Sequence, residues 1–199
     1  MRRTAVCSVC LALLATVTVS AGGNDGQLRR PGPHTEQIRP PDVDLVLNGA
    51  GIRNYLFFDI YRVALYLPQR QSDVRQVLND ELPRRVQITL LRDISAERDV
   101  DFLMAGLEDN NSAEELAAIQ APVEQFLNII RRMGKVPKGH VVLLDYQPAV
   151  GTRVWLNRRL LGVVPGVAFN RSLLKIWLGE NPIEKNLKRA LLGEGTGLL

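Results

Sequence analysis

The sequence predicts an α+β domain with a mostly antiparallel sheet. Segments with the period-two alternation of strands fall in two blocks, residues 56–90 and 140–163. Segments with helical spacing lie between these blocks, at 95–133, and after the second, at 167–193. Strands and helices therefore do not alternate in the regular order that builds a parallel sheet. At 199 residues the chain is long enough for one such domain with a sizeable core.

The first 21 residues, MRRTAVCSVCLALLATVTVSA, have the build of a secretory signal peptide. Two arginines precede an apolar stretch from Ala5 to Val19, and Val19-Ser20-Ala21 is similar to a signal-peptidase site. We expect cleavage after Ala21, and therefore a periplasmic or secreted protein. The alternative is an uncleaved membrane anchor, although the apolar stretch is shorter than the roughly 20 residues that span a bilayer.

Cleavage would change both the charge and the cysteine content. Removing Arg2 and Arg3 lowers the formal charge from +4 to about +2. This low charge argues against nucleic acid as a partner, because binding phosphates needs clustered positive charge. Cys7 and Cys10, the two cysteines, both lie in the predicted signal. The mature chain would have no disulfide and no thiol chemistry, so its stability would depend on its core.

Residues 22–41, GGNDGQLRRPGPHTEQIRPP, are predicted to form a disordered linker, because they are rich in Gly, Pro and charge. We place the folded domain at residues 42–199. Near its start the tetrapeptide NGAG, residues 48–51, lacks the lysine and the glycine spacing of a phosphate loop. We interpret it as a tight turn in which glycine adopts a positive φ.

The first block should contain two strands and a short helix. Leu56 to Leu67 is predicted to be one long strand, buried over much of its length, whose Tyr and Phe side chains belong mostly to the core. Ser72 can cap a short helix that extends to Asn79. In RRVQITLLR, residues 84–92, apolar and polar side chains alternate as in a half-buried strand.

The middle of the chain should be helical. Ser95 can cap a helix with an apolar stripe at Val100, Leu103, Met104 and Leu107. Ser112 and Glu115 form a capping box for a second helix, whose apolar face continues to Met133. Pro122 lies inside this second run and should kink or split it.

The last third of the chain predicts a meander of strands and then two helices. The strands are His140 to Tyr146, Thr152 to Leu156 and Arg159 to Val163, with a turn between the last two. A helix should run from Val167 until Gly179 stops it. The final helix should be capped by Asn181, have Pro182 at its first position and end at Gly193.

Few residues suit metal or nucleophilic chemistry. The two histidines, His34 and His140, have no supporting cysteine, and no close carboxylates complete a metal cage. No serine lies in a nucleophile-elbow sequence. We therefore expect no metal and no cofactor. The basic pairs at 84–85, 131–132 and 158–159 are scattered among acids, so we interpret them as solvated and expect no role at a membrane surface. Trp155 and Trp177 are expected in the core.

Arg53 is the candidate binding residue. Arginine keeps its charge in proteins, and its planar guanidinium matches a carboxylate. Beside an apolar strand it would stay buried only with an anion or several hydrogen-bond acceptors. The residues alone leave two alternatives open, a solvated or structural arginine and an arginine that waits in a pocket for an anionic ligand.

Four segments, LNGAGIR, YRVALYLP, LRDISAE and GVAFNRSLLKIWLGENP, resemble bacterial members of the chalcone isomerase-like family. Their order and spacing cover the chain from about Val43 to Gly193. The resemblance implies the open-faced β-sandwich of that family, in which helices pack on one face of a large antiparallel sheet and a ligand cleft lies between them.

The resemblance also bears on catalysis. The plant enzymes of the family close a flavanone ring by intramolecular addition of a phenolate, and their arginine after a GAGxR-like turn falls on Arg53. Their strand threonine falls on Tyr61, their catalytic tyrosine on Ser95, and the next lysine and asparagine on Arg98 and Phe102. Because these groups are replaced, we expect a protein without catalytic residues.

The fatty-acid-binding branch of the family uses an arginine and a tyrosine to hold a carboxylate, and Arg53 with Tyr61 could repeat that pair. In one straight strand the two would be roughly 26 Å apart at about 3.3 Å per residue, so they converge only if the chain turns between them, for example near Asn54. The leading hypothesis is an exported protein that binds a small amphipathic carboxylate. The alternatives are an isomerase or lyase with Arg53 stabilising an enolate or phenolate, and an interaction module without a ligand.

Overall fold

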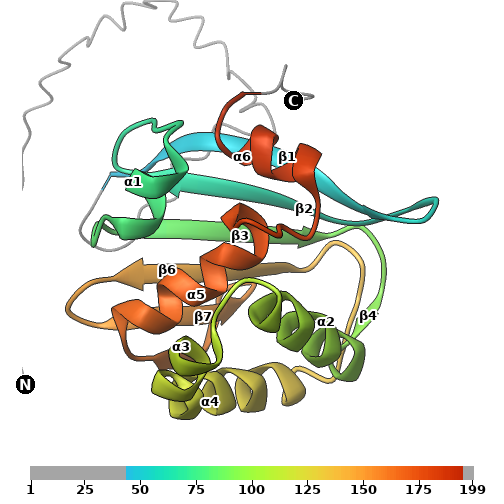
Figure 1. The fold of residues 1–199 in the computed structure, drawn as a ribbon. Coiled ribbons are helices and arrows are strands. Elements are labelled where there is room, and N and C mark those ends of the chain that lie inside the picture. Colours follow the sequence, from blue (N-terminus) through green and yellow to red (C-terminus); the bar gives the residue numbers. More distant parts are fainter. Residues whose placement is uncertain (1–43, 195–199) are drawn as a thin grey trace, which may run out of the picture.

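The computed structural model describes residues 44–194, so the predicted signal peptide (1–21) and linker (22–41) lie outside the described residues. Its main feature is a six-stranded sheet in which each strand is antiparallel to its neighbours (Figure 1). In spatial order the strands are β1 (Val46–Tyr55), β2 (Phe58–Leu67), β3 (Arg84–Leu90), β6 (Val141–Gln147), β7 (Gly151–Leu156) and β8 (Arg159–Val164).

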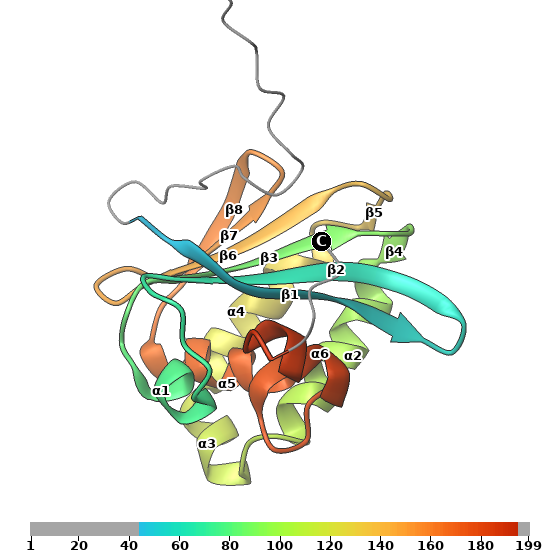
Figure 2. The ribbon, with the colours of Figure 1, turned by 90° about the horizontal axis from the view of Figure 1, so that it is seen from above.

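The helices lie on one face of this sheet, which Figure 2 shows nearly edge-on. They are α1 (Val74–Asn79), α2 (Ala96–Glu108), α3 (Ala113–Ala118), α4 (Gln120–Arg131), α5 (Val167–Leu178) and α6 (Lys185–Leu191). The arrangement confirms the α+β class and the open-faced β-sandwich. No helix in residues 44–194 is both long and apolar enough to cross a membrane.

A second, two-stranded sheet connects the ends of two helices. It pairs β4 (Ile94–Ser95) with β5 (Lys135–Val136) in antiparallel register. Since β4 leads directly into α2 and β5 follows α4, the pair fixes the start of one helix beside the end of the other. These two helices form one wall of the candidate site described below.

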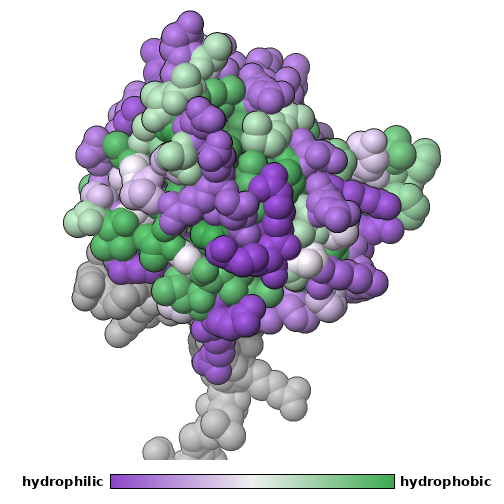
Figure 3. All heavy atoms as spheres, turned by 90° about the horizontal axis from the view of Figure 1, so that it is seen from below, coloured by the Kyte–Doolittle hydropathy of each residue, from purple (hydrophilic) through white to green (hydrophobic). Residues whose placement is uncertain are grey.

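The first two strands form a hairpin that sequence analysis did not divide correctly. The predicted strand Leu56 to Leu67 begins at Phe58, and the chain turns at Leu56-Phe57, where Leu56 has a φ of 56°. Its first residues are exposed, Phe57 by 98% and Phe58 by 53%, because the hairpin projects beyond the helices. Figure 3 shows this end as an apolar lobe at the right. The core therefore contains the later part of the strand only.

The NGAG segment is part of β1 and not a tight turn. Gly49 and Gly51 do not have positive φ, and what requires glycine is the approach of α6. A Cβ on Gly49 would lie 2.0 Å from the carbonyl oxygen of Ala190, and one on Gly51 would lie 2.7 Å from the Leu187 side chain. The two glycines let the last helix rest directly on the edge strand.

Two predicted helix starts were wrong. The cap of α1 is Asp73, whose carboxylate accepts a hydrogen bond from the Arg75 amide at 2.8 Å, instead of Ser72. The last helix starts at Lys185 rather than Pro182. Asn181 instead lies beside the end of α2, where its side-chain amide donates to the Asp109 carbonyl at 2.9 Å.

The other helix signals are confirmed. Ser112 and Glu115 form the reciprocal capping box of α3. The run containing Pro122 is split into α3 and α4, and Pro122 lies in the first turn of α4, where its missing N–H costs no hydrogen bond. Helix α5 ends at Gly179 as expected. Ser95 precedes α2, but its side chain makes no capping bond.

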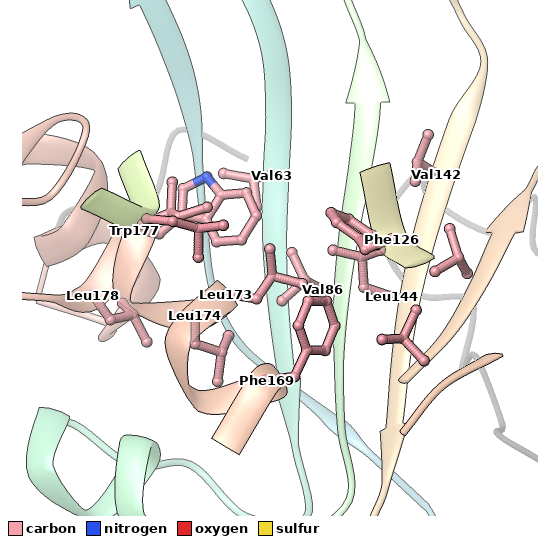
Figure 4. Packing of buried hydrophobic residues seen from close by; sticks show 14 of the residues in the cluster. Val63, Val86, Phe126, Val142, Leu144, Phe169, Leu173, Leu174, Trp177 and Leu178 are labelled. Atoms are coloured by element: carbon pink, nitrogen blue, oxygen red, sulfur yellow. The ribbon is translucent and has the colours of Figure 1, made fainter. Parts of the chain in front are cut away.

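The core fills the space between the sheet and the helices. Figure 4 shows side chains of α5, among them Phe169, Leu173 and Trp177, directed at sheet residues that include Val63 and Val86. Trp177 is 3% exposed, which confirms it as a core residue. Trp155 is half-buried and alternates with the buried Val154, so it lies on the opposite face of the sheet.

Candidate functional site

A cavity of about 490 Å³ lies between the sheet and the helices, and we name it the sheet–helix cavity. Most of its wall is apolar. The sheet contributes Ile60, Ile88, Leu90, Val142 and Leu144, and the helices contribute Leu103, Phe126, Ile130, Ile176 and Trp177. Its size is typical of a site for a small organic ligand, and its polar residues come mainly from the β1–β2 hairpin and from the start of α2.

The hairpin brings Arg53 and Tyr61 together. The two residues are directly opposite each other in the β1–β2 register, and both line the sheet–helix cavity. The turn that joins them lies at Leu56-Phe57, two residues beyond Asn54. Arg53 and Tyr61 are therefore not separated by the length of a straight strand. A cation and a phenol face the same apolar space.

Arg53 is held by a neighbouring acid as well as facing the cavity. Its side chain is 14% exposed, and its Nη1 atom lies 3.5 Å from Glu184 Oε2, which also accepts a hydrogen bond from the Asn54 amide. Its guanidinium lies 5.9 Å from the centre of the Tyr55 ring. A guanidinium has five N–H donors, so this single long ion pair leaves donors for a further anion.

Tyr61 is a neutral hydrogen-bonding group in this site. Its hydroxyl accepts a hydrogen bond of 3.1 Å from the indole Nε1 of Trp177. Burial raises the pKa of Tyr61 to about 12, although the bond from Trp177 and the charge of Arg53 act in the opposite direction. A hydroxyl that accepts from Trp177 keeps its own proton to donate, so Tyr61 can bond to an oxygen atom of a ligand.

Asp99, on α2, is a third polar residue of the cavity, and sequence analysis missed it. It is half-buried, and desolvation raises the pKa of its carboxyl from 3.8 to about 6. The signal that could have found it is its position four residues before Leu103, which places it beside the apolar stripe of the helix. A carboxyl with such a pKa can exchange a proton near neutral pH.

The positions that the resemblance aligned with catalytic groups lie around the same space. Ser95, Arg98 and Phe102 all line the sheet–helix cavity together with Tyr61. Ser95 comes from β4, while Arg98 and Phe102 are exposed residues of α2. The family resemblance thus named residues that line the same cavity, but it did not indicate the volume of the cavity or the presence of Asp99.

The described residues 44–194 contain no candidate metal site. In residues 44–194 no three His, Cys, Asp or Glu side chains gather in a group that could hold a metal ion. His140 immediately precedes β6 and does not line the cavity, and His34 lies outside the described residues. The polar residues that line the cavity are thus arginines, tyrosines and acids, with Ser95.

Comparison with known proteins agrees with the geometry. A family model described as chalcone isomerase-like matches residues 33–193. None of the curated proteins matches the chain. Among solved structures, the crystal structure of a fatty-acid binding protein from Arabidopsis thaliana is similar with a TM-score of 0.60. The two chains are 14% identical, and the alignment covers 74% of this chain and 86% of that one, which establishes a common fold.

Proposed function

Because the chain belongs to the chalcone isomerase-like family, we propose that it is a non-catalytic binding protein for a small amphipathic anion, such as a fatty acid. The observation that carries this proposal is the pairing of Arg53 with Tyr61 at an apolar cavity of about 490 Å³. The fold is also that of a protein described as binding fatty acids, which supports a lipid carboxylate as the ligand class.

Each part of the cavity suits one part of such a ligand. Arg53 supplies a permanent charge for the carboxylate, and Tyr61 supplies an O–H donor. The apolar wall covers the alkyl chain, and each methylene removed from water contributes about 0.8 kcal/mol before the cost of association is subtracted. Glu184 now pairs with Arg53, and the ligand carboxylate would either displace Glu184 or share Arg53 with it.

The proposal is tested by lipid capture. The purified protein is extracted with solvent and its lipids are measured by mass spectrometry, and its affinity for a fluorescent fatty acid is titrated. Arg53→Ala should weaken binding about 10- to 100-fold, the range for losing a charged hydrogen bond. Arg158→Ala, a change of an exposed arginine in the β7–β8 turn, is the matched control. Equal capture by Arg53→Ala and the control would remove Arg53 from the site.

A second candidate function, an isomerase or lyase, is favoured by Asp99. A carboxyl with a pKa of about 6 that lines the same cavity as Tyr61 and Arg53 could act as a general base while Arg53 stabilises an enolate or phenolate. Chalcones are the first substrates to assay. Turnover above the spontaneous background that disappears in Asp99→Asn would establish this function instead of the non-catalytic one. The third alternative, a ligand-free interaction module, required a filled cleft, and an open cavity beside Arg53 disfavours it.

We also propose that the protein is exported, on the evidence of its first 21 residues. Expression in a bacterial host followed by fractionation and intact-mass analysis tests this. A mature chain that begins at Gly22 in the periplasm or the medium is the expected product. A chain that keeps its first 21 residues and sediments with membranes would instead indicate the uncleaved anchor.

A further inference from the structure

The end of the β1–β2 hairpin exposes four consecutive large apolar side chains. Tyr55 is 49% exposed, Leu56 76%, Phe57 98% and Phe58 53%. Phe102 of α2 is 49% exposed, and its ring packs edge-on against Tyr55 with 6.0 Å between centroids. We name these five residues the hairpin tip. They make up five of the nine exposed large hydrophobic residues of the described chain, so its exposed apolar surface is concentrated at one place.

The hairpin tip is held in shape. The strands on either side of it are paired up to Tyr55 and Phe58, and the Asn54 side chain donates a hydrogen bond to Asp59 across its base. The Arg92 guanidinium lies over the Phe58 ring, 4.5 Å from its centre. An apolar surface that is fixed before it binds loses little conformational entropy on burial, which favours a role in binding.

From the sequence we expected no role at a membrane surface, because the basic pairs are scattered among acids, and we predicted Leu56 to Leu67 as a strand buried over much of its length. With its first residues exposed, we propose that the hairpin tip inserts into the interfacial region of a phospholipid bilayer. Aromatic side chains with adjacent arginines are the composition that membrane interfaces favour. In Figures 1 and 2 the hairpin extends beyond the helices, so its end can enter a flat surface without a clash.

The charges around the hairpin tip fit a bilayer that contains some anionic lipid. Arg92 and Arg98 are exposed beside it and can reach lipid phosphates. Acids lie there too, since Asp59 is at the base and Asp93 is paired with Lys135 at 3.0 Å. The charged residues around the hairpin tip are therefore of both signs. We expect apolar insertion to supply most of the binding, with a modest gain from anionic lipid and a modest loss with added salt.

The hairpin tip also borders the sheet–helix cavity. Tyr55, Phe58 and Phe102 belong to both, so a bilayer that receives the hairpin tip lies against the entrance of the cavity. A fatty acid could then pass between bilayer and cavity without crossing water. This last step rests on the proposed ligand function, whereas insertion of the hairpin tip does not.

The test compares full-length variants for binding to vesicles of phosphatidylcholine with a minor share of phosphatidylglycerol. Leu56→Ser with Phe57→Ser should lower the vesicle-bound fraction at least 10-fold in partition coefficient, because two large apolar side chains are lost from the bilayer. The control is Leu82→Ser with Val150→Ser, two residues exposed by 45% and 39% elsewhere, and it should bind like the wild type. Every variant keeps the same N-terminal residues, so their contribution cancels.

Direct insertion is measured with Phe57→Trp. Its fluorescence should be quenched by brominated phospholipid well beyond the quenching of Trp155 and Trp177 in the parent protein. The serine double variant should still capture fatty acid in solution but exchange it with vesicles more slowly. The proposal is wrong if the serine double variant binds vesicles as well as the control does. It is also wrong if Phe57 makes the protein self-associate without binding vesicles. Failure of Arg53→Ala to change ligand capture would refute only the ligand function.

Discussion

At the scale of single residues, the question is how a permanent cation remains largely buried. Arg53 meets the requirement with an ion pair of 3.5 Å to Glu184 and with the nearby ring of Tyr55. Neither interaction saturates the guanidinium. A partly paired arginine that faces an apolar cavity costs less to bury than an unpaired one, while it keeps donors for a ligand.

Glu184 should therefore compete with anionic ligands. Glu184→Gln removes the negative charge and keeps an oxygen that can accept from the Asn54 amide. We expect it to raise the affinity for a fatty acid several-fold, because the ligand carboxylate no longer faces a like charge. A titration beside Glu180→Gln, an exposed acid just after α5, gives the matched comparison. Weaker binding by Glu184→Gln would mean that Glu184 orients Arg53 rather than competing with the ligand.

Asp99 should make stability depend on pH. Since burial raises the pKa of its carboxyl from 3.8 to about 6, the folded protein favours the neutral form. The stability that this preference contributes is present below the unfolded pKa and is lost as the pH rises through about 6. Asp99→Asn should therefore raise the free energy of unfolding by about 1–2 kcal/mol at pH 8 and by almost nothing near pH 4.

Urea denaturation at both pH values measures this difference. Asp101→Asn, a change of an exposed acid on the same helix, is the control and should change little at either pH. A destabilising effect of Asp99→Asn at pH 8 would show that the carboxylate has a stabilising partner, which would contradict the assignment of its pKa shift to burial.

At the scale of elements, the sequence could predict what local chemistry decides. The capping box at Ser112, the split at Pro122 and the stop at Gly179 all follow from backbone hydrogen bonds within a few residues. A turn was considered near Asn54, but its position at Leu56-Phe57 could not be predicted, because neither residue is a turn former and the sequence is apolar on both sides. The roles of Gly49 and Gly51 depend on α6, about 140 residues later, so no local pattern reveals them.

The contact between β1 and α6 gives a prediction at this scale. Gly49→Ala places a methyl group against the backbone of Ala190, which cannot move without displacing the helix. We expect a loss of about 3 kcal/mol in the free energy of unfolding, the upper end for overpacking. Hydrogen exchange should show faster exchange of the α6 amides, and Val46→Ala at the exposed end of β1 should leave them unchanged. Protected α6 amides in Gly49→Ala would contradict the close packing.

At the scale of the whole molecule, the layered fold follows from the order of elements, but the cavity does not. Two blocks of strands and two of helices were enough to predict an α+β domain with a mostly antiparallel sheet, and the family resemblance added that helices cover one face. The volume of about 490 Å³ is the space that side chains from six strands and three helices leave unfilled. Such a space is a property of packing over the full domain. For this reason Arg53 could be nominated from the sequence, while its surroundings could not.

The cavity predicts how affinity changes with ligand length. In a series of saturated fatty acids, each added methylene should raise the affinity up to about fourfold, which corresponds to about 0.8 kcal/mol, until the cavity is full. Ile88→Phe reduces the volume of the cavity, so the affinity should stop increasing at a shorter chain length. Arg53→Ala should weaken all members of the series alike without changing the slope, because the charge and the chain occupy different parts of the site. Calorimetric titration measures both effects, and a slope near zero in the parent protein would mean that the alkyl chain lies outside the sheet–helix cavity.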